Sequence, residues 1–124
     1  MSTIKLEYHQ NIDGKMIKKE LEFSKYLLKE PYNQDSLFVS MVEGQSMESK
    51  INDKALVVAD LSNKEFVENG IYLVHKDARM WIKEAKTIEN EQFFVSINPN
   101  YSHLVYKANE SRVIAKALLT FTNL

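Results

Sequence analysis

Short apolar segments separated by turn signals run along almost the whole chain. Residues 2–9 alternate polar and apolar side chains, which is the pattern of a half-buried strand. Further apolar or β-branched runs occupy residues 36–42, 55–60, 71–74, 80–83 and 112–121. Gly, Asn, Asp or Pro residues separate most of these runs, as expected of turns. The pattern predicts a mostly β fold.

The first 35 residues give a more varied pattern. Residues 11–14 carry a turn signal, and residues 16–23 fit either a strand or a short helix. Ser24 is a suitable cap for a short helix near residues 24–29, which Pro31 would end. We expect at most this one short helix. We also expect one globular domain, in which an N-terminal arm (1–35) precedes the core (36–124).

Composition narrows the function classes. With 44% hydrophobic and 27% charged residues, the 124-residue chain is expected to fold around a core. A net charge of −1 argues against a domain that binds nucleic acid by itself. The absence of cysteine excludes disulfides and the usual zinc sites, and we expect no metal or cofactor. No apolar run is long enough to span a membrane and no secretory signal is apparent, so a cytoplasmic location is expected.

The most informative stretch is the G-x-S-M sequence at residues 44–47, which follows an apolar run. Gly44 permits a sharp turn that would hold the Ser46 hydroxyl clear of its neighbours. The backbone N–H groups of Gln45 and Ser46 could then point at one spot. A serine beside converging N–H donors can provide both a nucleophile and an oxyanion hole.

A serine nucleophile needs a base, and Lys83 is the candidate. The three histidines show no pattern tied to Ser46. Burial can lower a lysine pKa by roughly 3–5 units, which makes the neutral amine available as a base. Strand alternation places Trp81 on the same face as Lys83, so an apolar neighbour is at hand.

Taken together, these blocks resemble the LexA-type (S24) peptidases, which include the SOS repressor, phage lambda-type repressors and UmuD. The matching blocks are GQSM at 44–47, IND at 51–53, ALVVAD at 55–60, NGIYLV at 69–74, WIK at 81–83, SINPNY at 96–101 and RVIAKA at 112–117. The resemblance implies a β-clip type C-terminal domain of short twisted antiparallel sheets. It also implies that Ser46 is the nucleophile and Lys83 the general base.

The sequence departs from the family pattern in the turn after the serine. Ser49 stands where the family has proline, and Lys54-Ala55 stands where it has Gly-Asp. None of these positions supplies the nucleophile or the base. The departures therefore concern the geometry of the turn, and with it the efficiency of the chemistry.

The family cuts its own chain at a bond that precedes a glycine, some 30-odd residues before the serine. Asp13-Gly14 is the candidate, since Gly14 lies 32 positions before Ser46. Glycine suits a bond that must bend into an active site. Aspartate suits it less, because a carboxylate beside Lys83 would hold the amine charged. A simple hairpin turn at Asp13-Gly14 is an equally open interpretation.

The resemblance implies a self-cleaving regulatory and dimerisation domain of a phage or SOS-type transcriptional repressor. The expected partners are a second copy of the chain and the RecA–single-strand DNA filament as trigger. DNA would be bound only through a helix-turn-helix domain absent from this chain, and no membrane is involved. Two alternatives stay open: a UmuD-like subunit of an error-prone DNA polymerase, and a non-cleaving dimerisation module that kept the fold.

Overall fold

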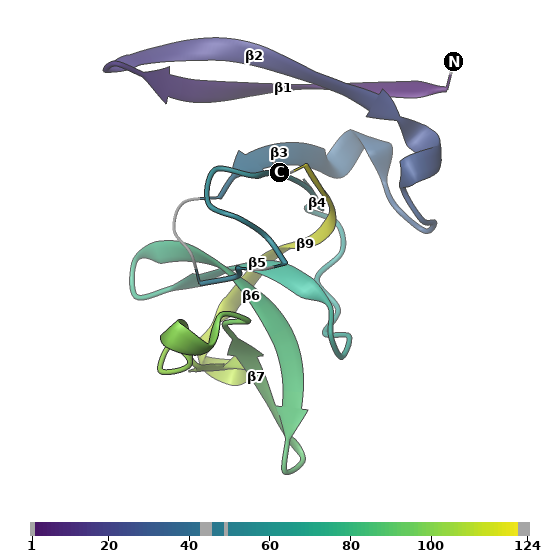
Figure 1. The fold of residues 1–124 in the computed structure, drawn as a ribbon. Coiled ribbons are helices and arrows are strands. Elements are labelled where there is room, and N and C mark those ends of the chain that lie inside the picture. The colour runs from purple at the N-terminus through teal and green to yellow at the C-terminus, as the bar shows by residue number, and fades with distance from the viewer. Residues whose placement is uncertain (1, 43–45, 49, 122–124) are drawn as a thin grey trace.

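The chain folds into two antiparallel sheets, a two-stranded hairpin and a seven-stranded sheet (Figure 1). The computed structural model describes residues 2–42, 46–48 and 50–121. In the larger sheet the strand order is β3-β4-β9-β5-β6-β7-β8. Its strands are β3 (Leu37–Met41), β4 (Leu56–Asp60), β5 (Ile71–Lys76), β6 (Arg79–Ile88), β7 (Glu91–Val95), β8 (Tyr106–Lys107) and β9 (Arg112–Phe121). The predicted mostly β, antiparallel fold is confirmed.

The hairpin consists of β1 (Thr3–Ile12) and β2 (Lys15–Ser24), which pair along their whole length. Asp13 and Gly14 form the turn between them, with φ values of 50° and 81°. Two successive residues at positive φ are typical of the tight turns that match strand twist. The predicted strand and turn are therefore present, and residues 16–23 form a strand rather than a helix.

The base of the hairpin belongs to the hydrophobic core. Ile4 and Phe23 face each other across the two strands and are almost fully buried. They pack with Leu28, which follows β2, and with Leu37 and Val58 of the larger sheet. Toward the turn the hairpin becomes exposed, as the 64% exposure of Met16 shows. In Figure 1 the hairpin lies across the top of the molecule, above β3.

The centre of the larger sheet is buried on both faces. Three consecutive residues of β4, Val57–Ala59, are fully buried, and so are three of β5, Tyr72–Val74. Continuous apolar runs are expected where both faces of a strand are covered. β9 lies between these two strands and joins them. The apolar runs read from the sequence are thus the central strands.

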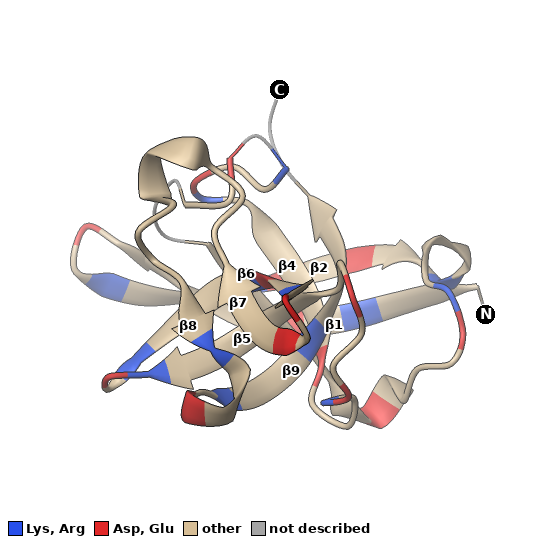
Figure 2. Cartoon of the chain, turned by 90° about the horizontal axis from the view of Figure 1, so that it is seen from below, with Lys and Arg blue, Asp and Glu red and all other residues tan. Residues whose placement is uncertain are grey.

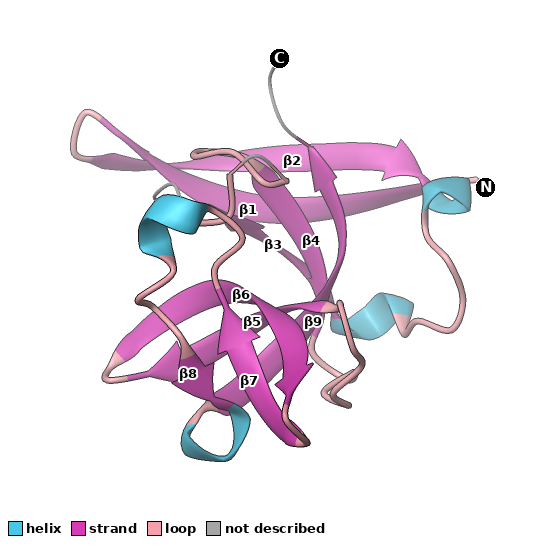
Figure 3. Ribbon diagram, turned by 60° about the horizontal axis from the view of Figure 1, so that its bottom comes forward, coloured by secondary structure: helices cyan, strands magenta, loops and turns pink. Residues whose placement is uncertain are grey.

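Helical structure in the described residues is limited to three-residue 3-10 helices (Figure 3). The first, Lys25–Leu27, is the predicted one, and the Ser24 side chain caps it by accepting from Tyr26 N–H at 3.2 Å. Three more, at Gln34–Ser36, Pro99–Tyr101 and Ala108–Glu110, were not predicted. Asn side chains cap two of them by accepting a backbone N–H two residues on, a pattern that reads as a turn in sequence.

Charged residues of both signs are interspersed over the strands and loops (Figure 2). This fits the small net charge of the chain. Within the described part of the chain, no helix has the length and apolar character needed to cross a membrane.

Candidate active site

A cleft of about 640 Å³ lies between the end of β3, the turn that carries Ser46 and the start of β6. Most of its lining is apolar, and it includes Met41, Met80, Trp81, Tyr101 and Leu104. Ser46 lines the cleft directly. The cleft therefore combines a hydroxyl with walls suited to an extended apolar segment.

The Ser46 turn is anchored on both sides. Before it, Val42 is buried, with its N–H donating to the Ala55 carbonyl at 2.8 Å and its carbonyl accepting from Lys54 N–H at 2.7 Å. After it, Met47 is 1% exposed and its carbonyl accepts from the N–H groups of Lys50 and Ile51. These contacts place the half-buried Ser46 at the cleft wall.

The departures in this turn have structural consequences. Lys54 has a φ of 68°, in the left-handed region that favours glycine. The family pattern has glycine at this position. Because a lysine carries a Cβ, it introduces backbone strain at this φ. Ala55 is 3% exposed and packs in the core, where its small apolar side chain fits.

Lys83 lies on β6 and is fully buried. Its Nζ lies 5.2 Å from the centre of the Trp81 ring and 5.6 Å from that of the Tyr106 ring. Burial lowers the pKa of Lys83 from 10.5 to about 8, because the charged form loses its hydration. Lys83 and Trp81 share a face, as strand alternation predicts.

Ser96 is the functional candidate that sequence reasoning missed. Lys83 Nζ donates a hydrogen bond of 2.5 Å to Ser96 Oγ. The register of β6 and β7 pairs Glu84 with Val95, so one step further Lys83 lies opposite Ser96. Directly opposed residues have Cβ atoms about 5 Å apart, within reach of a lysine and a serine.

One short segment contacts both predicted site residues. Asn98 N–H donates to the Ser46 carbonyl at 2.9 Å, and Ser96 accepts from Lys83. Residues 96–98 thus link the Ser46 turn to the Lys83 amine, although Lys83 is not among the residues that line the cleft. Among the described hydrogen bonds, none joins Ser46 Oγ directly to Lys83 Nζ.

The other predicted site residues lie elsewhere. Gln45, predicted as an oxyanion donor, lies outside the described residues, as do Gly44 and Ser49. Asp13-Gly14 lies in the hairpin turn, where a Cβ built on Gly14 would meet no atom within 4 Å. Neither Asp13 nor Gly14 lines the cleft. In this conformation the candidate bond is therefore in solvent.

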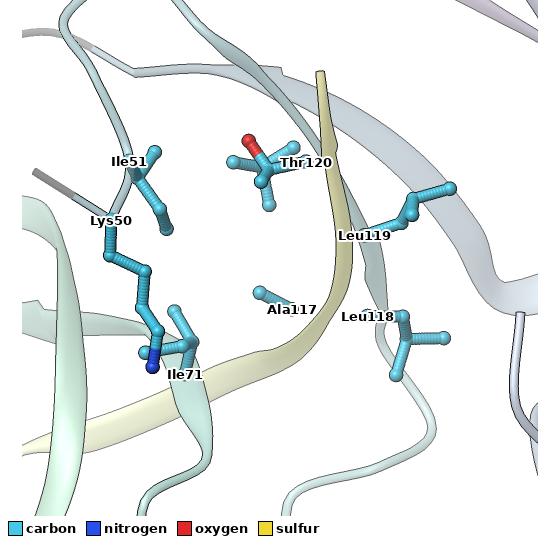
Figure 4. Close-up of a pocket in the computed structure, with 8 residues that line it drawn as sticks. Lys50, Ile51, Ile71, Ala117, Leu118, Leu119 and Thr120 are labelled. Atoms are coloured by element: carbon cyan, nitrogen blue, oxygen red, sulfur yellow. The ribbon is translucent and has the colours of Figure 1, made fainter. Parts of the chain in front are cut away.

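A second cavity, of about 170 Å³, lies beside the C-terminal half of β9 (Figure 4). Ile51, Ile71 and Ala117 contribute apolar walls. The Lys50 ammonium, at its rim, pairs with Glu84 at 3.3 Å. The lining of this cavity includes neither Ser46 nor Lys83, so we assign the candidate site to the larger cleft. Over the described part of the chain, no three His, Asp or Glu side chains gather to hold a metal ion.

The fold and the cleft define a class of protein: a mostly antiparallel β domain with a serine at the wall of a cleft and a buried lysine, each hydrogen-bonded to the segment 96–98. Comparison with family models identifies that class further. The model described as Peptidase S24-like matches residues 6–118, and the chain belongs to this family. The resemblance read from the sequence is thereby confirmed. A comparison with curated proteins finds no match.

Proposed function

We propose that the chain is the self-cleaving regulatory and dimerisation domain of a phage or SOS-type transcriptional repressor, with Ser46 as nucleophile and Lys83 as general base. The observation that carries the proposal is the desolvated Lys83 amine, held by the segment that also bonds the Ser46 turn. A lysine with a pKa of about 8 is partly neutral near physiological pH and can accept a proton.

The reaction follows from these roles. Neutral Lys83 takes the proton of Ser46, and Ser46 Oγ attacks the scissile carbonyl carbon. Backbone N–H groups of Gln45 and Ser46 stabilise the oxyanion, each contributing about 3 kcal/mol. The C–N bond breaks, Lys83 gives its proton to the leaving amine, and an ester on Ser46 remains. Water, deprotonated by Lys83, then hydrolyses the ester and restores the serine.

The proposed scissile bond is Asp13-Gly14. Because this bond stands in solvent at the hairpin turn, cleavage requires the turn to enter the cleft of the same chain or of a second copy. A homodimer and a RecA–single-strand DNA filament as trigger belong to the same proposal.

A second candidate is the non-cleaving dimerisation module, which the solvent position of Asp13-Gly14 favours. The β1–β2 pairing is continuous up to that turn, so the bond is not presented as an unpaired strand. A UmuD-like role in an error-prone polymerase would use the same serine and lysine. Binding of the chain to a polymerase would distinguish this role from that of a repressor.

The test is intact-mass analysis of the purified chain after incubation at pH 7 and near pH 9.5. We expect a new fragment beginning at Gly14, at higher yield at the alkaline pH. Ser46→Ala and Lys83→Met should abolish it, whereas Ser102→Ala, an exposed serine in a neighbouring turn, should leave it unchanged. An intact wild-type chain at both pH values would overturn self-cleavage and favour the non-cleaving module.

A further inference from the structure

We propose that Ser96 is a positioning residue for Lys83: its hydroxyl oxygen accepts one N–H of the amine and aims the nitrogen lone pair toward the Ser46 turn. This inference rests on the proposed function, and it adds a third side chain to the serine and lysine. Ser96 is not itself a reacting group in this account.

The sheet register fixes the contact. Pairing of β6 with β7 continues from Ile88 opposite Glu91 to Glu84 opposite Val95. Counting one step beyond this pairing places Lys83 opposite Ser96, the first residue after the end of β7. A residue just past a strand end keeps the facing direction of the strand but has a backbone that is free to turn. Ser96 can therefore face Lys83 while the chain continues toward Ser46.

The valence of the amine explains why the contact would orient it. A neutral amine has two N–H groups and one lone pair. One N–H donates to Ser96 Oγ at 2.5 Å, and the rings of Trp81 and Tyr106 lie against the amine. With these directions occupied, fewer orientations remain for the lone pair. Without Ser96 the buried amine would lose this hydrogen bond and could rotate.

The same segment couples the base to the nucleophile. Ser96 and Asn98 are two residues apart, and Asn98 N–H binds the Ser46 carbonyl at 2.9 Å. A shift of this segment would therefore move both the amine and the serine turn. Small errors in such geometry can lower a rate about 100-fold.

Two neighbouring strands, β5 and β8, place titratable side chains near the Lys83 amine. Tyr72 of β5 lies opposite Lys83 in register, and its hydroxyl is bonded to the backbone at Val67 and Glu65. From β8, Tyr106 contributes its ring.

On β6 itself, Arg79 lies over the Trp81 ring at 4.7 Å. Glu84 follows Lys83 in the strand and is paired with Lys50 and Lys86. Within the described part of the chain, no carboxylate forms an ion pair with Lys83. Ser96 is thus the hydrogen-bonding partner described for this amine.

The test compares Ser96→Ala and Ser96→Thr with the control Ser102→Ala. The first readout is the self-cleavage rate at saturating pH. The second is the titration midpoint of Lys83, followed by the ¹³Cε resonance in NMR spectra, which needs no activity. Melting curves of all variants check that they fold.

We expect Ser96→Ala to lower the rate by about 10- to 100-fold. Its Lys83 midpoint should fall, because the ammonium loses an acceptor. Ser96→Thr, which keeps the hydroxyl, should restore both, and Ser102→Ala should change neither. An unchanged Lys83 midpoint in Ser96→Ala would overturn the inference, even with a reduced rate. Complete loss of cleavage in Ser96→Ala, together with acylation of Ser96 in the wild-type chain, would also overturn it, since Ser96 would then be the nucleophile.

The two proposals can fail separately. If the wild-type chain does not cleave but Ser96→Ala still lowers the Lys83 midpoint, the contact is upheld and the proposed function is what fails. If cleavage depends on Ser46 and Lys83 but not on Ser96, the proposed function is upheld and the positioning role is rejected.

Discussion

Lys83 Nζ and Ser96 Oγ lie 2.5 Å apart, although 13 positions separate the two residues in the chain. The contact places a polar pair beside the aromatic rings of Trp81 and Tyr106. Buried polar groups are destabilising unless they are hydrogen-bonded. The hydrogen bond partners the Ser96 hydroxyl with the amine, but burial still disfavours the charged form of Lys83, as is common at functional sites.

The first prediction concerns stability and pH. The pKa of Lys83 is 10.5 when unfolded and about 8 when folded, so between these values the unfolded chain binds more protons. The free energy of unfolding should therefore rise as pH rises from about 8 to 10.5. As pH falls again this gain is lost, and it is gone once pH lies below the folded pKa of about 8. The full difference corresponds to roughly 3 kcal/mol.

Lys83→Met isolates this effect from other titrations. At pH 7 we expect the variant to be more stable than wild type by roughly 1–3 kcal/mol, since it removes a buried charge. The advantage should shrink toward pH 10.5. Urea unfolding of both proteins at several pH values measures it, and a pH-independent difference would contradict the account.

The second prediction concerns the turn after Ser46. Lys54 adopts a φ of 68°, which costs a non-glycine residue about 1 kcal/mol. Lys54→Gly should therefore stabilise the folded chain by up to about 1 kcal/mol. The Lys54→Ala variant is the control, because it removes the charge but keeps the strain. Equal stability of the two variants in thermal unfolding would contradict the expected net gain from glycine at this position.

The third prediction concerns Tyr72. Its hydroxyl accepts from Val67 N–H at 2.8 Å and donates to the Glu65 carbonyl at 2.6 Å. Tyr72→Phe leaves both backbone groups without this partner, so we expect a loss of about 1–3 kcal/mol. Tyr26→Phe, at a side chain that is 78% exposed, should change stability by less than about 0.5 kcal/mol. Similar urea midpoints for the two variants would refute the buried-hydroxyl role.

The fourth prediction concerns the hairpin. Ile4 is 2% exposed and packs with Phe23 against the larger sheet. Ile4→Ala should lower the free energy of unfolding by about 2–5 kcal/mol. Ile17→Ala, near the hairpin turn and 41% exposed, should lower it by much less. If both variants behave alike, the base of the hairpin does not share the core.

Much of the fold could be predicted because its central strands are continuous apolar runs. Val57–Ala59 and Tyr72–Val74 are buried on both faces, so their sequences carry an unambiguous signal. The Lys83 environment was predictable in part, since alternation alone places Trp81 on its face. Apart from Lys25–Leu27, the 3-10 helices of the described residues were not predicted, because an Asn cap such as Asn98 is indistinguishable from an ordinary turn in sequence.

Ser96 was missed because its role depends on strand register. The turn between β6 and β7 is Glu89-Asn90, and both residues have positive φ, 52° and 67°. Such turns are usually recognised by a glycine, which is absent here. Had this two-residue turn been identified, counting outward from it would have placed Ser96 opposite Lys83.

The central claim is that Lys83, neutral in its buried site, activates Ser46, and the rate of self-cleavage against pH tests it most directly. The account predicts a rate that rises with pH, has its midpoint near 8 and levels off above about 9.5. Ser46→Ala and Lys83→Met should show no cleavage across this range. Cleavage that persists in Lys83→Met, or a wild-type midpoint near 10.5, would contradict it.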